Sequence, residues 1–279
     1  MTVRPYLRGD READERRYLE LTLEIRQLGQ QLGGAEVEVV PISALHGYNV
    51  VERSRRASWY RGRTVLQALE LVPTSTFAAH GTTGVRLPVQ LLLRGAEGAS
   101  RIAGVLTGRG VRVDDEVVIL PQGRRTKVYS LETVDGAVSS APSPLSVSLT
   151  LVDGEGVERG DLIAAADDPP TVSRNQLATV CWFADRCLRK GQTFVVKHTT
   201  RLTGAEVVEV ESKLDLETLR LVPARELGAN DIGGVRWRLA EPVAADQYRD
   251  SRVTGSFIAI GPDSSVTVAA AMIGTPTLR

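Results

Sequence analysis

Residues 102–132 read IAGVLTGRGVRVDDEVVILPQGRRTKVYSLE, and this stretch decides the fold. It contains three short runs rich in branched apolar residues, at 102–107, 116–120 and 126–132. Gly108-Arg109-Gly110 separates the first two runs, and Pro121-Gln122-Gly123 separates the last two. Runs of this length, broken by glycine and proline, are typical of antiparallel strands. The stretch therefore predicts part of a small antiparallel β-barrel.

Runs of the same kind continue on both sides of this stretch. Together they predict a first series of strands at residues 86–93, 102–107, 116–120, 126–132, 145–151 and 161–165. Asp167-Asp168-Pro169-Pro170 is typical of a linker. A second series follows at residues 176–183, 193–198, 202–213, 220–221, 233–240, 253–260 and 265–272. The chain is therefore expected to be mainly β, with two antiparallel barrels in tandem.

The first 72 residues have a different pattern. Residues 11–32 predict a helix because apolar residues recur at three- and four-residue steps, at Tyr18, Leu21, Ile25, Leu28 and Leu32. Residues 36–42 predict a valine-rich strand, and residues 64–72 a second helix that begins with a capping box. Helix, strand and helix are typical of part of an α/β domain. The expected domains are 1–72, an α/β remnant, 73–168, the first barrel, and 169–279, the second barrel.

Composition narrows the class of protein. The 34 Lys and Arg residues balance 34 Asp and Glu residues, which disfavours a general role in nucleic-acid binding. No apolar run approaches the ~20 residues of a membrane span, and Met1-Thr2-Val3-Arg4-Pro5 lacks the apolar segment of a signal peptide. The two cysteines form no disulfide framework. We therefore expect a cytoplasmic protein without membrane contact.

Several sequence blocks carry a resemblance. Val39-Val40-Pro41-Ile42-Ser43-Ala44-Leu45-His46-Gly47 resembles the last guanine-nucleotide motif of a translation-factor GTPase. Further blocks are PISALHGYNVVERS at residues 41–54, WYRG at 59–62, RLPVQ at 86–90, GVRVDDEVVILP at 110–121, KHTTR at 197–201 and TGSFI at 254–258. Together they resemble the GTPase (large) subunit of bacterial heterodimeric sulfate adenylyltransferase, in the elongation factor Tu-like superfamily. The resemblance implies two barrels like elongation factor Tu domains 2 and 3, preceded by a remnant of a P-loop GTPase domain.

The resemblance also implies a function. Its members hydrolyse GTP with Mg²⁺ to drive the adenylation of sulfate by ATP, which gives adenosine 5′-phosphosulfate. A separate small subunit, the implied partner, handles ATP and sulfate. Ser43, Ala44 and Leu45 are the implied guanine-binding residues. Tyr48 stands where the family has an acidic residue.

The phosphate-binding part of such a GTPase has no counterpart in the sequence. No segment fits the G-x-x-x-x-G-K-[ST] loop that cradles phosphates. Only 38 residues precede Val39, so the front of the GTPase domain is expected to be missing. We expect this chain alone to be a truncated, partner-binding and regulatory piece that neither hydrolyses GTP nor binds it tightly. Two alternatives stay open: a working GTPase when the front is supplied by another chain, and a translation-factor-like RNA-binding module.

The remaining candidates favour structural roles. No catalytic residue and no metal ligand is predicted, because His46, His80 and His198 lack neighbours at metal-ligand spacing. Two D-x-x-G patterns, at residues 153–156 and 231–234, are interpreted as turns. Cys181 is expected to be a buried thiol on one strand face with Leu177 and Phe183, and Cys187 to lie across a turn from it.

Two basic clusters are interpreted as solvated loops, with docking to an acidic partner surface, or to RNA, as the functional alternative. They contain Arg53, Arg55, Arg56, Arg61 and Arg63 in the first cluster, and Arg124, Arg125 and Lys127 in the second.

Overall fold

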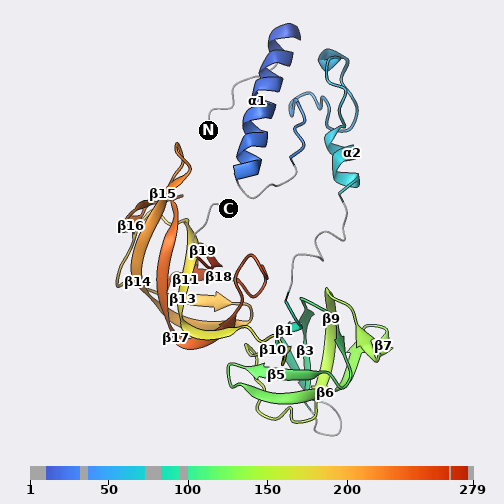
Figure 1. Ribbon diagram of the computed structural model, residues 1–279, viewed down its shortest axis with the longest axis vertical. Helices are drawn as coiled ribbons and strands as arrows, with labels where there is room; N and C mark the ends of the chain where they lie inside the picture. Colours follow the sequence, from blue (N-terminus) through green and yellow to red (C-terminus); the bar gives the residue numbers. More distant parts are fainter. Residues whose placement is uncertain (1–10, 32–36, 73–82, 95–99, 264, 276–279) are drawn as a thin grey trace. The chain divides into compact units, whose positions relative to one another are not determined.

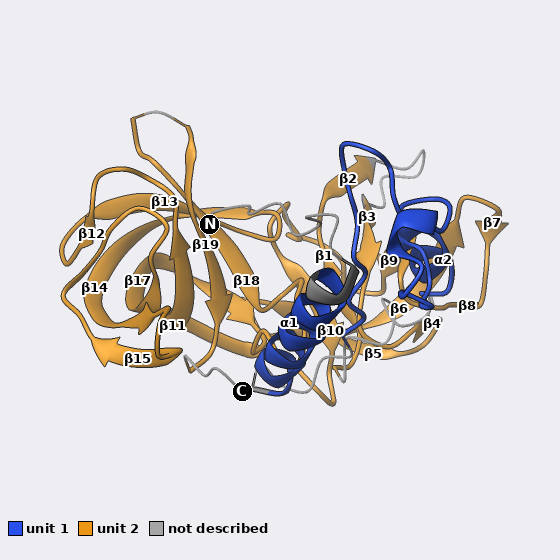
Figure 2. Ribbon diagram, turned by 90° about the horizontal axis from the view of Figure 1, so that it is seen from above, with its two compact units in different colours: residues 1–76, 277–279 blue, residues 77–276 orange. Residues whose placement is uncertain are grey.

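The computed structural model describes residues 11–31, 37–72, 83–94, 100–263 and 265–275 (Figure 1). It divides into two compact units, residues 1–76 with 277–279, and residues 77–276 (Figure 2). None of the helices in the described ranges is long and apolar enough to cross a membrane.

The first unit is helical. Helix α1 spans Arg11–Gln31, a short 3-10 helix η1 spans Arg55–Ala57, and α2 spans Val65–Glu70. The predicted capping box is confirmed: the Thr64 hydroxyl accepts a hydrogen bond from the Gln67 amide, and the Gln67 side chain accepts one from the Thr64 amide. The end of the first predicted helix at Leu32 lies outside the described residues.

The predicted strand at residues 36–42 is wrong where it can be compared. Residues 37–42 join no strand pairing among the described residues, and only an isolated bridge between Ser43 and Tyr48 follows them. Side chains take over part of the hydrogen bonding that a neighbouring strand would supply. The Tyr18 hydroxyl donates to the Val39 carbonyl at 3.0 Å, and Asn49 Nδ2 donates to the Pro41 carbonyl at 2.8 Å.

The first barrel is built from one antiparallel sheet. Its strands are β1 Arg86–Pro88, β2 Leu91–Arg94, β3 Ser100–Leu106, β5 Glu116–Leu120, β6 Arg124–Thr133, β9 Leu145–Leu151 and β10 Leu162–Ala165, paired in the order β1-β10-β5-β6-β9-β3-β2. A bridge between Arg86 and Thr107 links β1 to the end of β3. The inward side chains, among them Leu87, Ile102, Ile119 and Leu149, are fully buried.

Two corrections concern this barrel. The single strand predicted at residues 86–93 is two strands, because the chain changes neighbours at its middle: the Val89 amide donates to Asp161 and the Gln90 amide to Ala103. Three two-residue strands were not predicted. They are β4 Val111–Arg112, which pairs with β8 Ser140–Ala141, and β7 Gly136–Ala137, which extends β6.

The second barrel closes completely. Its ring contains β11 Thr171–Trp182, β13 Thr193–His198, β14 Arg201–Asp215, β17 Ile232–Ala245, β18 Ser256–Ile260 and β19 Thr267–Ile273. Pairing of β13 with β14 joins its two ends. Strand β15 Arg220–Pro223 extends β14 off the ring, and β12 Leu188–Arg189 pairs with β16 Glu226–Leu227.

Aromatic rings fill the centre of the second barrel. Phe194 packs edge-on against Trp182 and Trp237, at centroid distances of 5.6 and 5.9 Å, and Trp237 meets Phe257 at 5.8 Å. Edge-to-face pairs of this kind add to the stabilisation that burial gives. The neighbouring residues of β11 that face this core are Ala178, Val180 and Trp182.

The expected burial of Cys181 is therefore wrong. Cys181 shares the outward face of β11 with Leu177 and Phe183, and Phe183 is 51% exposed. Cys181 is only partly covered, although this burial raises the pKa of its thiol. Cys181 and Cys187 are both free thiols.

The two barrels share a junction with polar and apolar contacts. Arg86 of the first barrel pairs with Asp246 beyond β17, and Arg201 of β14 donates to Asp161 at 2.7 Å. A small apolar cluster of Val118, Leu120, Leu162, Ala164 and Ala244 lies between them. Both Arg86 and Asp161 are almost completely buried, so each pair is held away from solvent.

Candidate functional site

The implied guanine-binding residues lie in one tight turn. Ser43 and Tyr48 form its base, where the Ser43 amide donates to the Tyr48 carbonyl at 3.2 Å. The Ser43 hydroxyl accepts from the His46 amide at 3.4 Å, and Gly47 has a φ of +69°, which favours glycine. The structure thus brings Ser43, Ala44 and Leu45 together at the tip of a defined loop.

Asn49 holds this turn in place. Asn49 is 1% exposed. Its Nδ2 donates to the Pro41 carbonyl, and its Oδ1 accepts from the Ser54 amide, both at 2.8 Å. Its φ is +55°, a conformation that asparagine tolerates better than most residues. The Asn49 carbonyl also accepts from the Val65 amide at the start of α2. Asn49 therefore connects the segment before the turn, the turn itself and helix α2.

The turn presents backbone donors and little else. Among the described residues, the amides of Ala44 and Leu45 have no recorded acceptor, and the Leu45 side chain is 87% exposed. Two such amides fit the carbonyl edge of a base. In the described ranges, no three His, Cys, Asp or Glu side chains are grouped so that they could hold a metal ion. The turn thus presents two backbone N–H groups that have no acceptor among the described residues.

An aromatic cluster supports the same unit. The ring of Tyr18 lies 5.2 Å from Trp59 and 5.6 Å from Tyr60, and the Tyr60 hydroxyl donates to the Arg63 carbonyl at 2.9 Å. Burial raises the pKa of Tyr60 above its usual value. A cavity of about 300 Å³ adjoins the cluster and is lined also by Glu38 and Arg61. The cluster packs α1 against the segment that follows the turn.

The histidines in the described residues contact other parts of the fold. His46 stacks on Tyr48 at 5.2 Å, whereas His198 is buried, with Nε2 2.8 Å from the Thr254 carbonyl. Burial lowers the pKa of His198. His80 lies outside the described residues.

The two D-x-x-G patterns differ. Residues 153–156 form turns, as predicted. Asp231 follows a turn and accepts from the Gly228 amide at 2.8 Å, but Gly233 and Gly234 belong to β17. The turn prediction for residues 231–234 is therefore wrong for its last three residues, which belong to β17.

The first basic cluster is exposed. Arg53, Arg55, Arg56 and Arg61 have no recorded carboxylate partner among the described residues, and Arg63 lies 3.4 Å from Glu38. In the second cluster Lys127 lies 3.9 Å from Glu116, and Arg124 donates to the Glu155 carbonyl.

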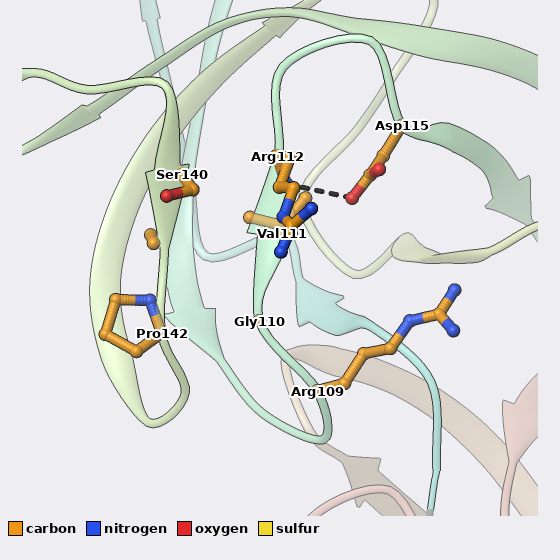
Figure 3. A pocket seen from close by; sticks show the side chains of 8 residues that line it. Arg109, Gly110, Val111, Arg112, Asp115, Ser140 and Pro142 are labelled. Atoms are coloured by element: carbon orange, nitrogen blue, oxygen red, sulfur yellow. Dashed lines mark hydrogen bonds between the residues drawn. The ribbon is translucent and has the colours of Figure 1, made fainter.

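Sequence reasoning missed three features. The role of Asn49 was not predicted, although asparagine and glycine close together, here Gly47 and Asn49, are typical of a turn. The Arg86–Asp246 pair joins residues 160 positions apart, and nothing in the local pattern announces it. A hollow lined by Arg109 and Arg112, shown in Figure 3, depends on two-residue strands that carry no periodicity.

Known proteins match this chain over most of its length. The GTP-eEF1A C-terminal domain-like family matches residues 175–274. The bifunctional enzyme CysN/CysC of Mycobacterium tuberculosis (strain ATCC 25618 / H37Rv) is 36% identical over 266 residues, which cover 93% of this chain and 43% of that protein. Sulfate adenylyltransferase subunit 1 of Psychromonas ingrahamii is 32% identical over 260 residues, covering 93% of this chain and 55% of that protein.

Solved structures agree on the fold. Sup35 complexed with GMPPNP matches with a TM-score of 0.63 and 20% identity, over 93% of this chain and 64% of that one. The apo form of translation elongation factor SelB from Methanococcus maripaludis matches with a TM-score of 0.58 and 16% identity, over 95% of this chain and 55% of that one. The chain spans about half the length of the sequence relatives. The predicted resemblance and fold class are confirmed: the chain is a homologue of sulfate adenylyltransferase subunit 1 and of CysN/CysC, with the mainly β, translation-factor-like fold.

Proposed function

We propose that this chain is the partner-binding and regulatory part of a sulfate-activating adenylyltransferase, working with a small subunit that handles ATP and sulfate. The observation that carries the proposal is the match to sulfate adenylyltransferase subunit 1, which extends over 93% of the chain and includes both barrels. A protein named as one subunit works with another. The junction between the barrels supports a binding role, because buried ion pairs hold the two as one platform.

We further propose that the chain does not hydrolyse GTP by itself. The Ser43–Ala44–Leu45 turn offers amides to a base, and one or two such hydrogen bonds contribute only ~1 kcal/mol each. Most of the affinity for a nucleotide triphosphate comes from phosphate and Mg²⁺ contacts. The sequence contains no phosphate-loop pattern that would supply them.

Calorimetry with a non-hydrolysable GTP analogue and Mg²⁺ tests this part of the proposal. We expect no saturable binding tighter than about 10 μM, a range equivalent to ~7 kcal/mol. Guanosine alone is the control for the base contact. Clear micromolar binding of the analogue would contradict the proposal.

A second candidate function is favoured by the geometry of the turn. The free amides at Ala44 and Leu45 and the clamp at Asn49 support base binding by this loop. This supports a GTPase that is active when the remaining part of a GTPase domain is supplied by another polypeptide. Restored GTP hydrolysis on mixing with such a polypeptide, and its loss in Asn49→Ala, would support this candidate over the first.

A further inference from the structure

Two adjoining hollows lie at one end of the first barrel. One has a volume of about 650 Å³ and contains Arg112 in its lining; the other, of about 310 Å³, contains Arg125. Both are lined by Arg109 and Asp115, so the two hollows adjoin at these side chains. We call them together the arginine groove, defined by Arg109, Arg112, Asp115 and Arg125.

Close backbone contacts hold the walls of the arginine groove in place. Strands β4 and β8 pair beside it, and a Cβ on Gly110 would lie 2.6 Å from the Ala141 carbonyl oxygen, so only glycine fits there. Asp114 adopts a φ of +71°, and the Asp115 carboxylate accepts from the Arg112 amide at 2.8 Å. These contacts fix the turn that carries Arg112 before any ligand arrives.

The carboxylates of the groove have bonding partners, whereas two of its arginines have no carboxylate partner among the described residues. Asp167 accepts two hydrogen bonds from Arg109, at 2.7 and 3.0 Å, and this bonding lowers the pKa of Asp167. Asp115 is bonded to the backbone, and Glu116 lies 3.9 Å from Lys127. By contrast, Arg112 and Arg125 have no recorded carboxylate partner among the described residues. The groove therefore offers two unpaired guanidinium forks, while each of its carboxylates already faces a cation or an amide.

Apolar surface accompanies these charges. The lining includes Val111, Ala141 and Pro142 in the larger hollow, and Val85 and Ala165 in the smaller one. Figure 3 shows the side chains of Arg109 and Arg112 bordering the same space as Pro142 and Ser140. A ligand that satisfies such a lining has carboxylates spaced between apolar groups.

We propose that the arginine groove binds an extended acidic peptide segment of a partner protein, in which carboxylate side chains alternate with apolar ones. The inference rests on the proposed function as a partner-binding part and adds where and through which chemistry the partner is held. Carboxylates match the planar fork of arginine, which binds them through paired hydrogen bonds.

A free phosphate or sulfate fits the groove less well. Arginine also binds such ions, but sites built for them often add several convergent backbone amides. Here the Arg112 amide is bonded to Asp115 and the Val113 amide to the Ser139 carbonyl, so both are already engaged. The volume also exceeds what one small ion fills.

The test uses the full chain and a fluorescent peptide that alternates Glu with Leu, followed by anisotropy. We expect saturable binding that weakens about tenfold, or ~1.4 kcal/mol, in the double variant Arg112→Glu, Arg125→Glu. The matched control is Arg225→Glu, Arg249→Glu, two exposed arginines of the second barrel, which should bind like the original chain. Circular dichroism and thermal melting establish that each variant is folded.

Three outcomes overturn the inference: equal weakening in both double variants, equal binding of a peptide that alternates Lys with Leu, or displacement of the peptide by inorganic phosphate at matched concentration. The measurement needs neither nucleotide nor the small subunit. Failure here leaves the proposed function standing, whereas absent subunit binding with intact peptide binding would contradict only the proposed function.

Discussion

The guanidinium of Arg86 and the carboxylate of Asp246 meet through two hydrogen bonds of 2.9 Å each, across the junction of the two barrels. The Arg86 side chain is 1% exposed and that of Asp246 is 9% exposed. Arg86 also donates to the carbonyls of Val85 and Asp168. The stability of a buried cation with this many partners depends on all of them being present.

Removing the charge of Asp246 should therefore strongly destabilise the barrels. For Asp246→Asn we expect the free energy of unfolding to fall by about 3 kcal/mol, because buried Arg86 then keeps only the exposed Asp168 carboxylate, at 3.6 Å, as a counter-charge. Replacing both partners by apolar residues, Arg86→Met with Asp246→Leu, should cost less. Urea unfolding followed by tryptophan fluorescence measures this. Asp250→Asn is the control, since Asp250 pairs with Arg249 only at 3.7 Å in solvent; an equal effect there would contradict the prediction.

Stability should decrease as the pH falls below neutrality because of His198. Burial is the main cause that lowers its pKa below the ordinary 6.5, with the Arg201 charge acting the same way, against the Thr254 hydrogen bond and Asp246. The folded state therefore favours neutral His198, and the unfolded chain binds more protons as the pH falls through about 6.5. His198→Gln keeps a donor for Thr254 without titrating there. Thermal melts from pH 7.5 to 5 should show a shallower pH dependence in His198→Gln, and identical slopes would rule out this role.

Backbone amides of residues 37–42 should exchange with solvent much faster than those of β5. Residues 37–42 lack a paired strand among the described residues, whereas β5 is paired on both sides, by β6 and β10. Exchange requires opening of the hydrogen bonds that protect an amide. Hydrogen exchange followed by mass spectrometry compares the two segments. Equal protection would mean that residues 37–42 pair with a strand of another copy.

The first basic cluster should control how fast the small subunit associates. Changing Arg55, Arg56, Arg61 and Arg63 to Glu should slow association and remove its dependence on salt, because exposed charges at an interface act mainly on encounter. Surface plasmon resonance over a salt series measures both effects. Arg225→Glu, Arg249→Glu serves as the control for added negative charge. Unchanged association rates would mean that the cluster is a solvated loop without a role in docking.

Most strands of both barrels could be predicted because most of the runs are several residues long and are separated by turn residues. The stretch at residues 102–132 yielded β3, β5 and β6 close to their observed bounds. Two-residue strands such as β4 and β8 are too short to have a period. Their position depends on Gly110 meeting Ala141, a contact between distant parts of the chain.

The face of β11 shows why alternation alone misleads. Leu177, Thr179, Cys181 and Phe183 alternate with Ala178, Val180 and Trp182, and both sets contain apolar residues. The pattern therefore does not decide which set points inward. The closing of the ring decides it, because Trp182 packs on Phe194 inside the barrel.

The candidate turn was predicted from a motif, whereas the Asn49 side chain that holds the turn in place was not predicted. Ser43, Ala44 and Leu45 follow the valine run as they do in the motif, so their place in one loop could be read from the chain. The clamp at Asn49 joins Pro41 and Ser54 on either side of it, and the Asn49 carbonyl accepts from Val65 at the start of α2. The role of Asn49 depends on the folded unit and could not be predicted from the sequence motif.

The ring of the second barrel also bears on how this chain behaves at high concentration. A strand with a free edge is a template for the edge of another molecule, and β13 paired with β14 leaves the ring without one. Strand β15 lies off the ring, and it is four residues long, begins with Arg220 and ends with Pro223, which has no amide hydrogen to donate. A charge, a proline and short length are the features that keep natural edges from recruiting further strands, so this half of the molecule is built to resist fibre growth even when it is crowded or newly synthesised.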